Sequence, residues 1–266
     1  MTPEQKALAA AIAALLERGE GVDAVWLSGS LGKGEGDAFS DVDVLALTRD
    51  GACAKVSAEV VTRLSEIAEP ALVNLLFGGR VLNVVTTDWE RFDISFVEAG
   101  DRHRYDPAGL TPLFNRTGHA PAPWPPMAPY LLPAAKIEAM VKEFLRVLGL
   151  AAVVLGREDY VLAISGLELQ RRALIDLMIE ANRIAPPDRG GALHLRRLLT
   201  PEQIGLLEQL PALKAERQAV LEANLEITRL YLPLARRLCE EAGAQWPQTL
   251  EDATRRRLKL ALGLEI

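Results

Sequence analysis

Residues Trp26 to Leu45 read WLSGSLGKGEGDAFSDVDVL, and this stretch decides the fold. It begins as a short apolar run typical of a strand, passes through glycines at 29, 32, 34 and 36, and ends in a second strand-like run that opens on two aspartates. Glycines let a backbone approach a ligand closely and turn its amides toward that ligand, and the Ser30 hydroxyl can donate to a phosphate oxygen. Without the aspartates, a plain glycine hairpin would be the simpler explanation.

Asp41 and Asp43 supply the chemistry of this stretch. Residues two apart on a strand project from the same face, so the two carboxylates can share one hard cation or bridge a pair of cations. An Asp-x-Asp at a strand start is also a common turn or cap feature. Its position directly after the glycine-rich turn favours the cation site.

A third carboxylate is expected on a neighbouring strand, where it completes the metal ligands and accepts a proton from an attacking hydroxyl. Asp93 meets that need, because it interrupts an apolar run in which an unpaired buried carboxylate is costly. Alternation places Asp93 on the face opposite Phe92 and Ile94. Two simpler explanations are a charge on an edge strand and a partner for Arg91.

The first 119 residues predict an α/β (α+β) domain with a mixed sheet. Apolar residues at helical spacing predict a helix over 3–18, which stops at Gly19, and a crossover helix over 53–68. Short apolar or β-branched runs between turn residues predict strands over 22–28, 42–48, 71–77, 80–87 and 92–97.

Residues 120–133 contain six prolines, which exclude regular hydrogen-bonded structure and predict a semi-rigid linker. Beyond it, the apolar period predicts helices over 137–155, 160–184, 201–213, 216–241 and 250–262. We therefore expect an α/β domain over 1–119, a linker over 120–133 and an all-α helical bundle over 134–266; the family resemblance given below implies that the first domain is the nucleotidyltransferase domain and that the second binds the acceptor. Asp176 and Glu180 lie four apart on one helix face, which is either solvated or lines a site for a cationic acceptor.

Composition indicates a soluble globular protein, with 49% apolar and 25% charged residues among 266. The net charge of −6 and the lack of a basic groove disfavour nucleic acid as a partner. No apolar run approaches the roughly 20 residues of a membrane span and no signal peptide begins the chain, so we expect a cytoplasmic protein without membrane contact. Cys53 and Cys239 read as ordinary buried residues, and the three histidines lack the spacing of a zinc site.

Gly29-Ser30, ten intervening residues, Asp41-Val42-Asp43 and a lone aspartate in a later strand resemble the DNA polymerase beta-type nucleotidyltransferase superfamily. Within it, an α/β domain followed by a helical domain is similar to the antibiotic nucleotidyltransferases that adenylylate aminoglycosides and lincosamides. The sequence GEGDAFSD at 34–41 is most similar to the corresponding segment of the lincosamide group. The motif-level similarity covers residues 22–98, and the helical half resembles these enzymes in architecture only.

The resemblance implies transfer of a nucleoside monophosphate, usually AMP from ATP, to a hydroxyl, with release of pyrophosphate. It implies two Mg²⁺ ions held by Asp41, Asp43 and Asp93, all three of which are catalytic, with Asp93 as the general base. Nucleotide binding would fall to Gly29, Ser30, Lys33 and Ser40. In some members a glutamate of the helical domain is the base, and no motif here transfers that role.

Three hypotheses remain. The first is an enzyme that modifies a small hydroxylated acceptor, such as an aminoglycoside or a lincosamide. The second shares the chemistry but acts on a protein, a metabolite or a nucleic-acid end. The third is a non-catalytic nucleotide-binding partner of the toxin-antitoxin type, which predicts a broken carboxylate triad, whereas all three aspartates are present. The apolar helical half also suggests a homodimer, which light scattering can test.

Overall fold

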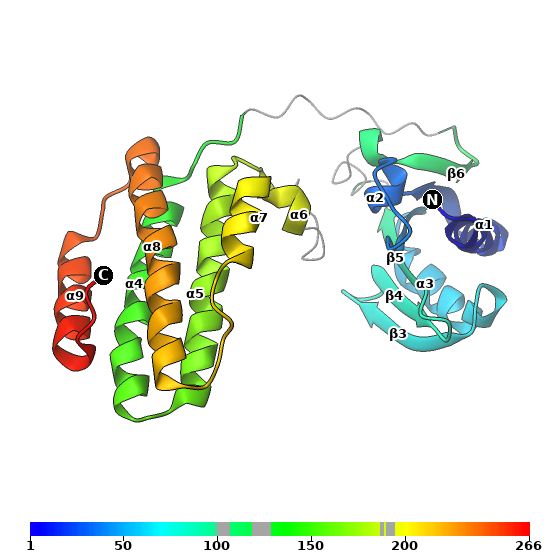
Figure 1. Cartoon of the computed structure of the whole chain (residues 1–266). Helices are drawn as coiled ribbons and strands as arrows, with labels where there is room; N and C mark the ends of the chain where they lie inside the picture. Colours follow the sequence, from blue (N-terminus) through cyan, green and yellow to red (C-terminus); the bar gives the residue numbers. More distant parts are fainter. Residues whose placement is uncertain (99, 101–106, 119–128, 187–188, 190–194) are drawn as a thin grey trace. The chain divides into compact units, whose positions relative to one another are not determined.

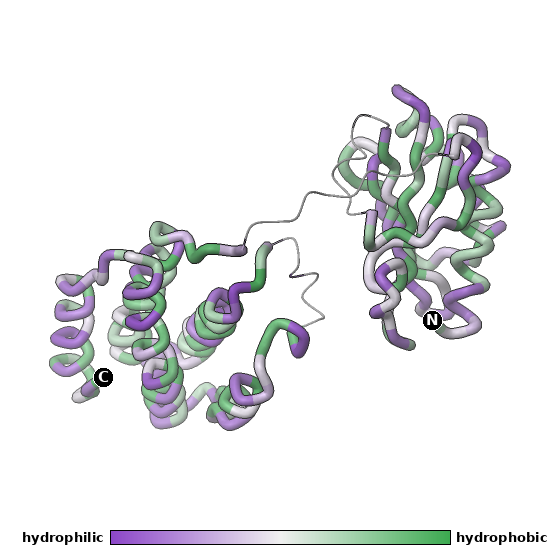
Figure 2. Tube along the Cα trace, turned by 90° about the horizontal axis from the view of Figure 1, so that it is seen from above, coloured by the Kyte–Doolittle hydropathy of each residue, from purple (hydrophilic) through white to green (hydrophobic). Residues whose placement is uncertain are grey.

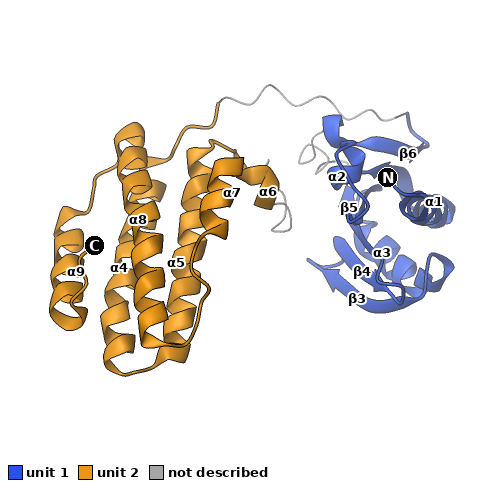
Figure 3. Ribbon diagram, in the orientation of Figure 1, with its two compact units in different colours: residues 1–127 blue, residues 128–266 orange. Residues whose placement is uncertain are grey.

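A computed structural model describes residues 1–98, 100, 107–118, 129–186, 189 and 195–266 of the chain. The chain divides into two compact units, Met1–Met127 and Ala128–Ile266 (Figure 3). Residues 120–128 of the predicted linker lie outside the described part, and 129–133 contain neither helix nor strand. In the described residues no helix combines the length and the apolar character that a membrane span requires.

The first unit is built on a mixed six-stranded sheet with the order β3-β4-β5-β2-β1-β6 (Figure 1). The parallel pair is β2 with β5, and the other neighbouring pairs are antiparallel. The strands are β1 (Val22–Leu27), β2 (Val42–Thr48), β3 (Pro70–Leu76), β4 (Val81–Thr86), β5 (Arg91–Glu98) and β6 (Thr111–Asn115). The last strand was not predicted, because it is short and contains Pro112, a residue that the edge of a sheet tolerates.

Helices cover one face of this sheet. α1 (Pro3–Arg18) packs on β1, β2 and β6, and α3 (Cys53–Thr62) packs on β5. Their apolar stripes meet alternate strand residues, including Val42, Val44, Phe92 and Ile94, in a buried core. The residues between these, Asp43 and Asp93 among them, therefore belong to the opposite face.

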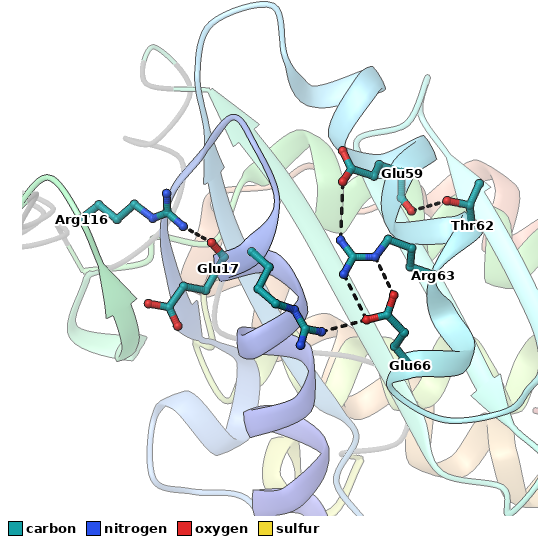
Figure 4. A network of polar contacts seen from close by, with 7 residues as sticks. Glu17, Glu59, Thr62, Arg63, Glu66 and Arg116 are labelled. Atoms are coloured by element: carbon teal, nitrogen blue, oxygen red, sulfur yellow. Dashed lines mark hydrogen bonds and ion pairs between the residues drawn. The ribbon is translucent and has the colours of Figure 1, made fainter.

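A charged network ties α1 to the end of α3 (Figure 4). The Arg63 guanidinium donates to Glu66 over 2.7 Å, and Arg18 donates to the same carboxylate over 2.9 Å. The predicted helix over 53–68 is thus shorter than expected: α3 ends at Thr62, and a single 3-10 turn, η1 (Leu64–Glu66), carries the glutamate to its partners.

The second unit is a helical bundle, as predicted. Its helices are α4 (Ala134–Gly156), α5 (Tyr160–Ala181), α6 (Leu195–Leu198), α7 (Pro201–Glu208), α8 (Arg217–Ala242) and α9 (Gln248–Leu262). α4 packs against α5, α8 and α9, and apolar and hydrophilic segments alternate along the helices, as amphipathic packing requires (Figure 2). At its centre the rings of Phe144 and Tyr231 stack 3.6 Å apart.

Helix ends depart from the predicted ends for local reasons. The helix expected over 201–213 stops at Glu208, because Pro211 offers no backbone donor and disfavours helical geometry before it. The helix expected over 160–184 stops at Ala181, and the backbone reaches a left-handed conformation at Arg183 (φ 58°). α6 was not predicted, because one turn is too short to show a period.

Glu180 does not lie on a solvated face. Its side chain is 1% exposed, accepts a hydrogen bond from the Tyr130 hydroxyl over 2.8 Å, and pairs with Lys136 at 2.6 Å and Arg189 at 2.7 Å. These partners hold its pKa below the usual value despite the opposing effect of burial. Glu180 is therefore a structural anchor of the bundle and is not free to contact a cationic acceptor.

Candidate active site

The carboxylates of Asp43 and Asp93 are brought together by strand pairing. β2 and β5 run parallel, and in their register Asp43 lies opposite Asp93. Both belong to the sheet face that α1 and α3 leave uncovered, and Asp41 directly precedes β2. Because β5 lies between β4 and β2, Asp93 is not on an edge strand, and the simpler explanation from an edge position is excluded.

Crowding of negative charge shows in the pKa values. Burial raises the pKa of Asp43 to about 7, and repulsion from Asp41 and then Asp93 adds to that shift, with Arg91 opposing it. The pKa of Asp93 is also raised, chiefly by burial and further by Asp41. A cation placed among these groups would remove both the repulsion and the cost of burying their charge.

Gly29 packs directly against the Asp43 carboxylate. A Cβ atom on Gly29 would lie 1.9 Å from Asp43 Oδ2, and the backbone there is left-handed (φ 58°). Only glycine meets both conditions without strain. Gly29 begins α2 (Gly29–Gly32), a single helical turn where a glycine-rich turn was predicted, and the Ser28 amide donates to the Asp43 carbonyl over 2.8 Å. The turn and the carboxylate are thus fixed to each other.

The loop that leads to Asp41 is held from two sides. The side-chain amide nitrogen of Gln5, in α1, donates to the backbone carbonyls of Asp37 and Ser40, each over 2.8 Å. Arg91 donates to the Phe39 carbonyl over 3.2 Å, so its guanidinium supports this loop from β5. The backbone of the loop is therefore pinned just before its metal-binding candidate.

The predicted nucleotide-binding residues differ in their surroundings. Ser30 is half-buried in α2, and Lys33 is exposed at its end. The Ser40 hydroxyl accepts from the Asp37 amide over 3.0 Å and lies 3.1 Å from the Asp37 carboxylate, so it stabilises the loop in this structure. Nucleotide binding by Gly29, Ser30, Lys33 and Ser40 stays a prediction.

Asn83 is a site residue that the sequence analysis missed. It lies opposite Asp93 in the antiparallel pairing of β4 with β5, and the hydrogen bond from its side chain lowers the pKa of Asp93, against the effect of burial. Asn74 of β3 lies opposite Asn83 in turn. Asn83 interrupts the apolar run VLNVVT as Asp93 interrupts its own strand, so the same criterion applied to β4 would have found it.

The donor set suits a hard divalent cation. Oxygen ligands of full negative charge are those that Mg²⁺ prefers, and the strand register places Asp43 opposite Asp93, with Asp41 two residues before Asp43. Within the described residues, however, no three His, Cys, Asp or Glu side chains already converge as a closed ligand cluster. The assignment of Asp41, Asp43 and Asp93 as metal ligands therefore stays a prediction. All three histidines lie outside the described residues.

Comparisons with known proteins give structural similarity only. No family model and no curated protein matches the sequence. An aminoglycoside 6-adenyltransferase from Bacillus subtilis aligns at 14% identity over 98% of this chain and 100% of its own, with a TM-score of 0.46. A nucleotidyltransferase-like protein from Exiguobacterium sibiricum 255-15 aligns at 14% identity over 92% of this chain and 83% of its own, with a TM-score of 0.34. Similarity this distant assigns no reaction to the chain.

Proposed function

We propose that this chain is a metal-dependent nucleotidyltransferase that moves a nucleoside monophosphate, AMP from ATP, onto a hydroxyl of a small molecule such as an aminoglycoside or a lincosamide. The observation that carries the proposal is the in-register pair of Asp43 and Asp93 on parallel strands, next to Asp41 and against a glycine that no other residue can replace without strain. A sheet interior has no structural use for carboxylates that repel one another in this way.

The three aspartates would hold two Mg²⁺ ions. Such ions, when bound, neutralise charge on both the entering and the leaving oxygen of an in-line displacement. The acceptor oxygen forms a bond to the α-phosphorus, the bond from that phosphorus to the bridging oxygen breaks, and pyrophosphate leaves. Asp93 takes the proton of the acceptor hydroxyl, and the hydrogen bond from Asn83 favours the ionised form of this carboxylate against the effect of burial.

Ser30 and the backbone of Gly29 would contact the β- and γ-phosphates, with Lys33 and Ser40 beside them. The exposed position of Lys33 leaves its ammonium available to a triphosphate. The charge of −6 fits a neutral or cationic acceptor better than a nucleic acid. The cytoplasmic location and the homodimer stay predictions.

The test measures pyrophosphate release from ATP and Mg²⁺ across a panel of aminoglycosides, lincosamides and unrelated hydroxyl compounds. Asp93→Asn removes the proposed base with little change in shape, and Asp88→Asn, in the turn between β4 and β5, is the matched control. We expect acceptor-dependent release that Asp93→Asn reduces by roughly 10²-fold or more and that Asp88→Asn leaves intact. Equal release by Asp93→Asn, with a native circular dichroism spectrum, would exclude Asp93 as the base. No release with any acceptor would refute the small-molecule assignment.

A further inference from the structure

The outer strand β3 of the six-stranded sheet is apolar and exposed. It stands at one end of the strand order, so in the described part of the chain its pairing with β4 leaves one row of its backbone groups without a neighbouring strand (Figure 1). The run over 70–79 contains no charged residue, although 25% of the chain is charged. Four large apolar side chains of β3 are exposed to between 37% and 50%, namely Leu72, Val73, Leu75 and Leu76.

Both faces of β3 contribute to this exposed surface. Asn74 belongs to the open face of the sheet, because the strand pairing connects it through β4 to Asp93, and Leu72 shares that face by alternation. Val73 and Leu75 belong to the face that the helices cover, yet they too are exposed. A helix could cover only one of these faces, and it could not pair with the free edge, because its own backbone groups are bonded internally. The surface therefore fits a strand.

The opposite edge of the sheet is protected in a way that β3 is not. β6 contains Pro112, which offers no backbone donor to a further strand. In β3 the proline is the first residue, Pro70, and the pairing irregularity lies between Pro70 and Leu72, so the rest of the strand is regular. A regular, apolar edge without charges pairs readily with another extended strand. β3 is thus an interaction surface for a strand.

The charges that flank β3 indicate the direction and the sequence of that strand. Glu69 directly precedes β3, Arg80 follows its turn, and both are exposed. An antiparallel strand of the same sequence brings the acidic end of each copy toward the basic end of the other, whereas a parallel one places like charges together. The uncharged run between them adds no repulsion. The segment over 69–80 is therefore complementary to itself.

We propose that β3 is the interface of a homodimer, in which β3 of one chain pairs antiparallel with β3 of a second copy and joins the two sheets into one. The two-fold axis of such a pair is perpendicular to the sheet, so the open faces that carry Asp43 and Asp93 lie on the same side in both copies. The pairing is closed, whereas β3 against β6 would repeat without end. The proposal places the association on the first unit and does not rest on the nucleotidyltransferase assignment.

Sedimentation equilibrium of the full chain, between about 1 and 300 μM, measures the association. We expect the mass of the wild type to approach that of two chains as the concentration rises. Leu75→Lys places a charge within the pairing, at an exposed position where an edge strand tolerates lysine, and should raise the dissociation constant at least tenfold. Leu169→Lys, at an exposed leucine of α5, is the matched control and should keep the dimer. Circular dichroism and thermal unfolding check that each variant is folded.

Two charge reversals test the direction of the pairing. Glu69→Lys alone and Arg80→Glu alone each place like charges at both ends of the paired strands, so each should weaken the dimer roughly tenfold at low ionic strength. An equimolar mixture of the two variants restores opposite charges at both ends of the mixed dimer. The mixture should therefore associate about as tightly as the wild type.

A wild type that stays monomeric at the highest concentration overturns the proposal. A mass that increases without limit also overturns it, because it indicates open-ended assembly. Loss of the dimer in Leu169→Lys with its retention in Leu75→Lys would assign the interface to the helical unit instead. Charge-reversal variants that associate as tightly alone as in their mixture would exclude the antiparallel pairing.

Discussion

Replacing Asp43 by Asn should stabilise the metal-free protein at neutral and alkaline pH. The pKa of this carboxyl is about 7 in the folded chain, above its ordinary value of 3.8, so folding favours the protonated form. The stability linked to that proton is fully present below the unfolded pKa and is lost as the pH rises through about 7. Asparagine is uncharged and nearly isosteric, so it escapes this loss.

The size of the effect follows from the two pKa values. If the whole difference between the folded and unfolded pKa values acted on stability, the free energy of unfolding of the wild type would fall by about 4 kcal/mol at about pH 8. Water and small movements of the strands relieve part of the repulsion. We therefore expect the free energy of unfolding of Asp43→Asn to exceed that of the wild type by about 2 kcal/mol at about pH 8, and by almost nothing near about pH 4.

Urea unfolding in EDTA, followed by circular dichroism between about pH 4 and 8, measures this difference. Asp50→Asn, in the exposed turn after β2, is the control and should follow the wild type. Mg²⁺ should restore stability to the wild type increasingly as the pH rises, because it binds the ionised carboxylates, and should restore less to Asp43→Asn. Parallel pH profiles for Asp43→Asn and the wild type in EDTA would refute the reasoning.

Three further changes test other parts of the structure. Gly29→Ala should abolish nucleotidyl transfer and lower stability by about 2 kcal/mol, because its Cβ would strike a carboxylate at a left-handed position, whereas Gly34→Ala, also left-handed but in open space, should keep activity when both are assayed side by side. Asn83→Leu should move the acidic limb of the pH–rate profile toward higher pH, since Asp93 loses a hydrogen bond that lowers its pKa; an unmoved limb would deny Asn83 this role. Glu251→Ala should lower the free energy of unfolding in urea by about 3 kcal/mol, because the fully buried Glu251 carboxylate pairs with the guanidinium groups of Arg236 and Arg255, which lose their partner. A loss below about 1 kcal/mol would contradict that view.

The order of helices and strands could be predicted from residue patterns because each pattern records burial on one face. In β2, Val42, Val44 and Ala46 belong to the core under the helices, whereas Leu45 and Leu47 belong to a second buried cluster, and Asp43 is the strand's one acidic residue. β6 escaped prediction because its pairing with β1 depends on a partner 84 positions away, as in Thr111 opposite Leu27, and its five residues include a proline. Local patterns do not record such long-range pairing.

The same limit applies to the site. Asp41 and Asp43 were predicted from their spacing after a glycine-rich turn, and Asp93 was predicted because a charge in an apolar strand needs an explanation; their role in a site stays a prediction. The pairing of Asn83 with Asp93 could not be predicted, since strand order and register are properties of the assembled sheet. Glu180 shows the opposite error, because its helical spacing suggested a solvated face. Its side chain is instead buried by Tyr130, Lys136 and Arg189, which lie outside α5, so the helical period of α5 gives no sign of them.

The parallel pairing of β2 with β5 also has a kinetic consequence. Asp43 and Asp93 become neighbours only after a connection through α3, β3 and β4 has closed, because parallel strands need a crossover. The repulsion between Asp43 and Asp93 is therefore created by a long-range step of folding, whereas Asp41 and Asp43 are neighbours in sequence and repel each other in the unfolded chain as well. A cation that binds the finished site acts after that step, so it should slow unfolding while leaving the folding rate nearly unchanged. The active site would then lengthen the lifetime of the native state rather than guide the chain toward it.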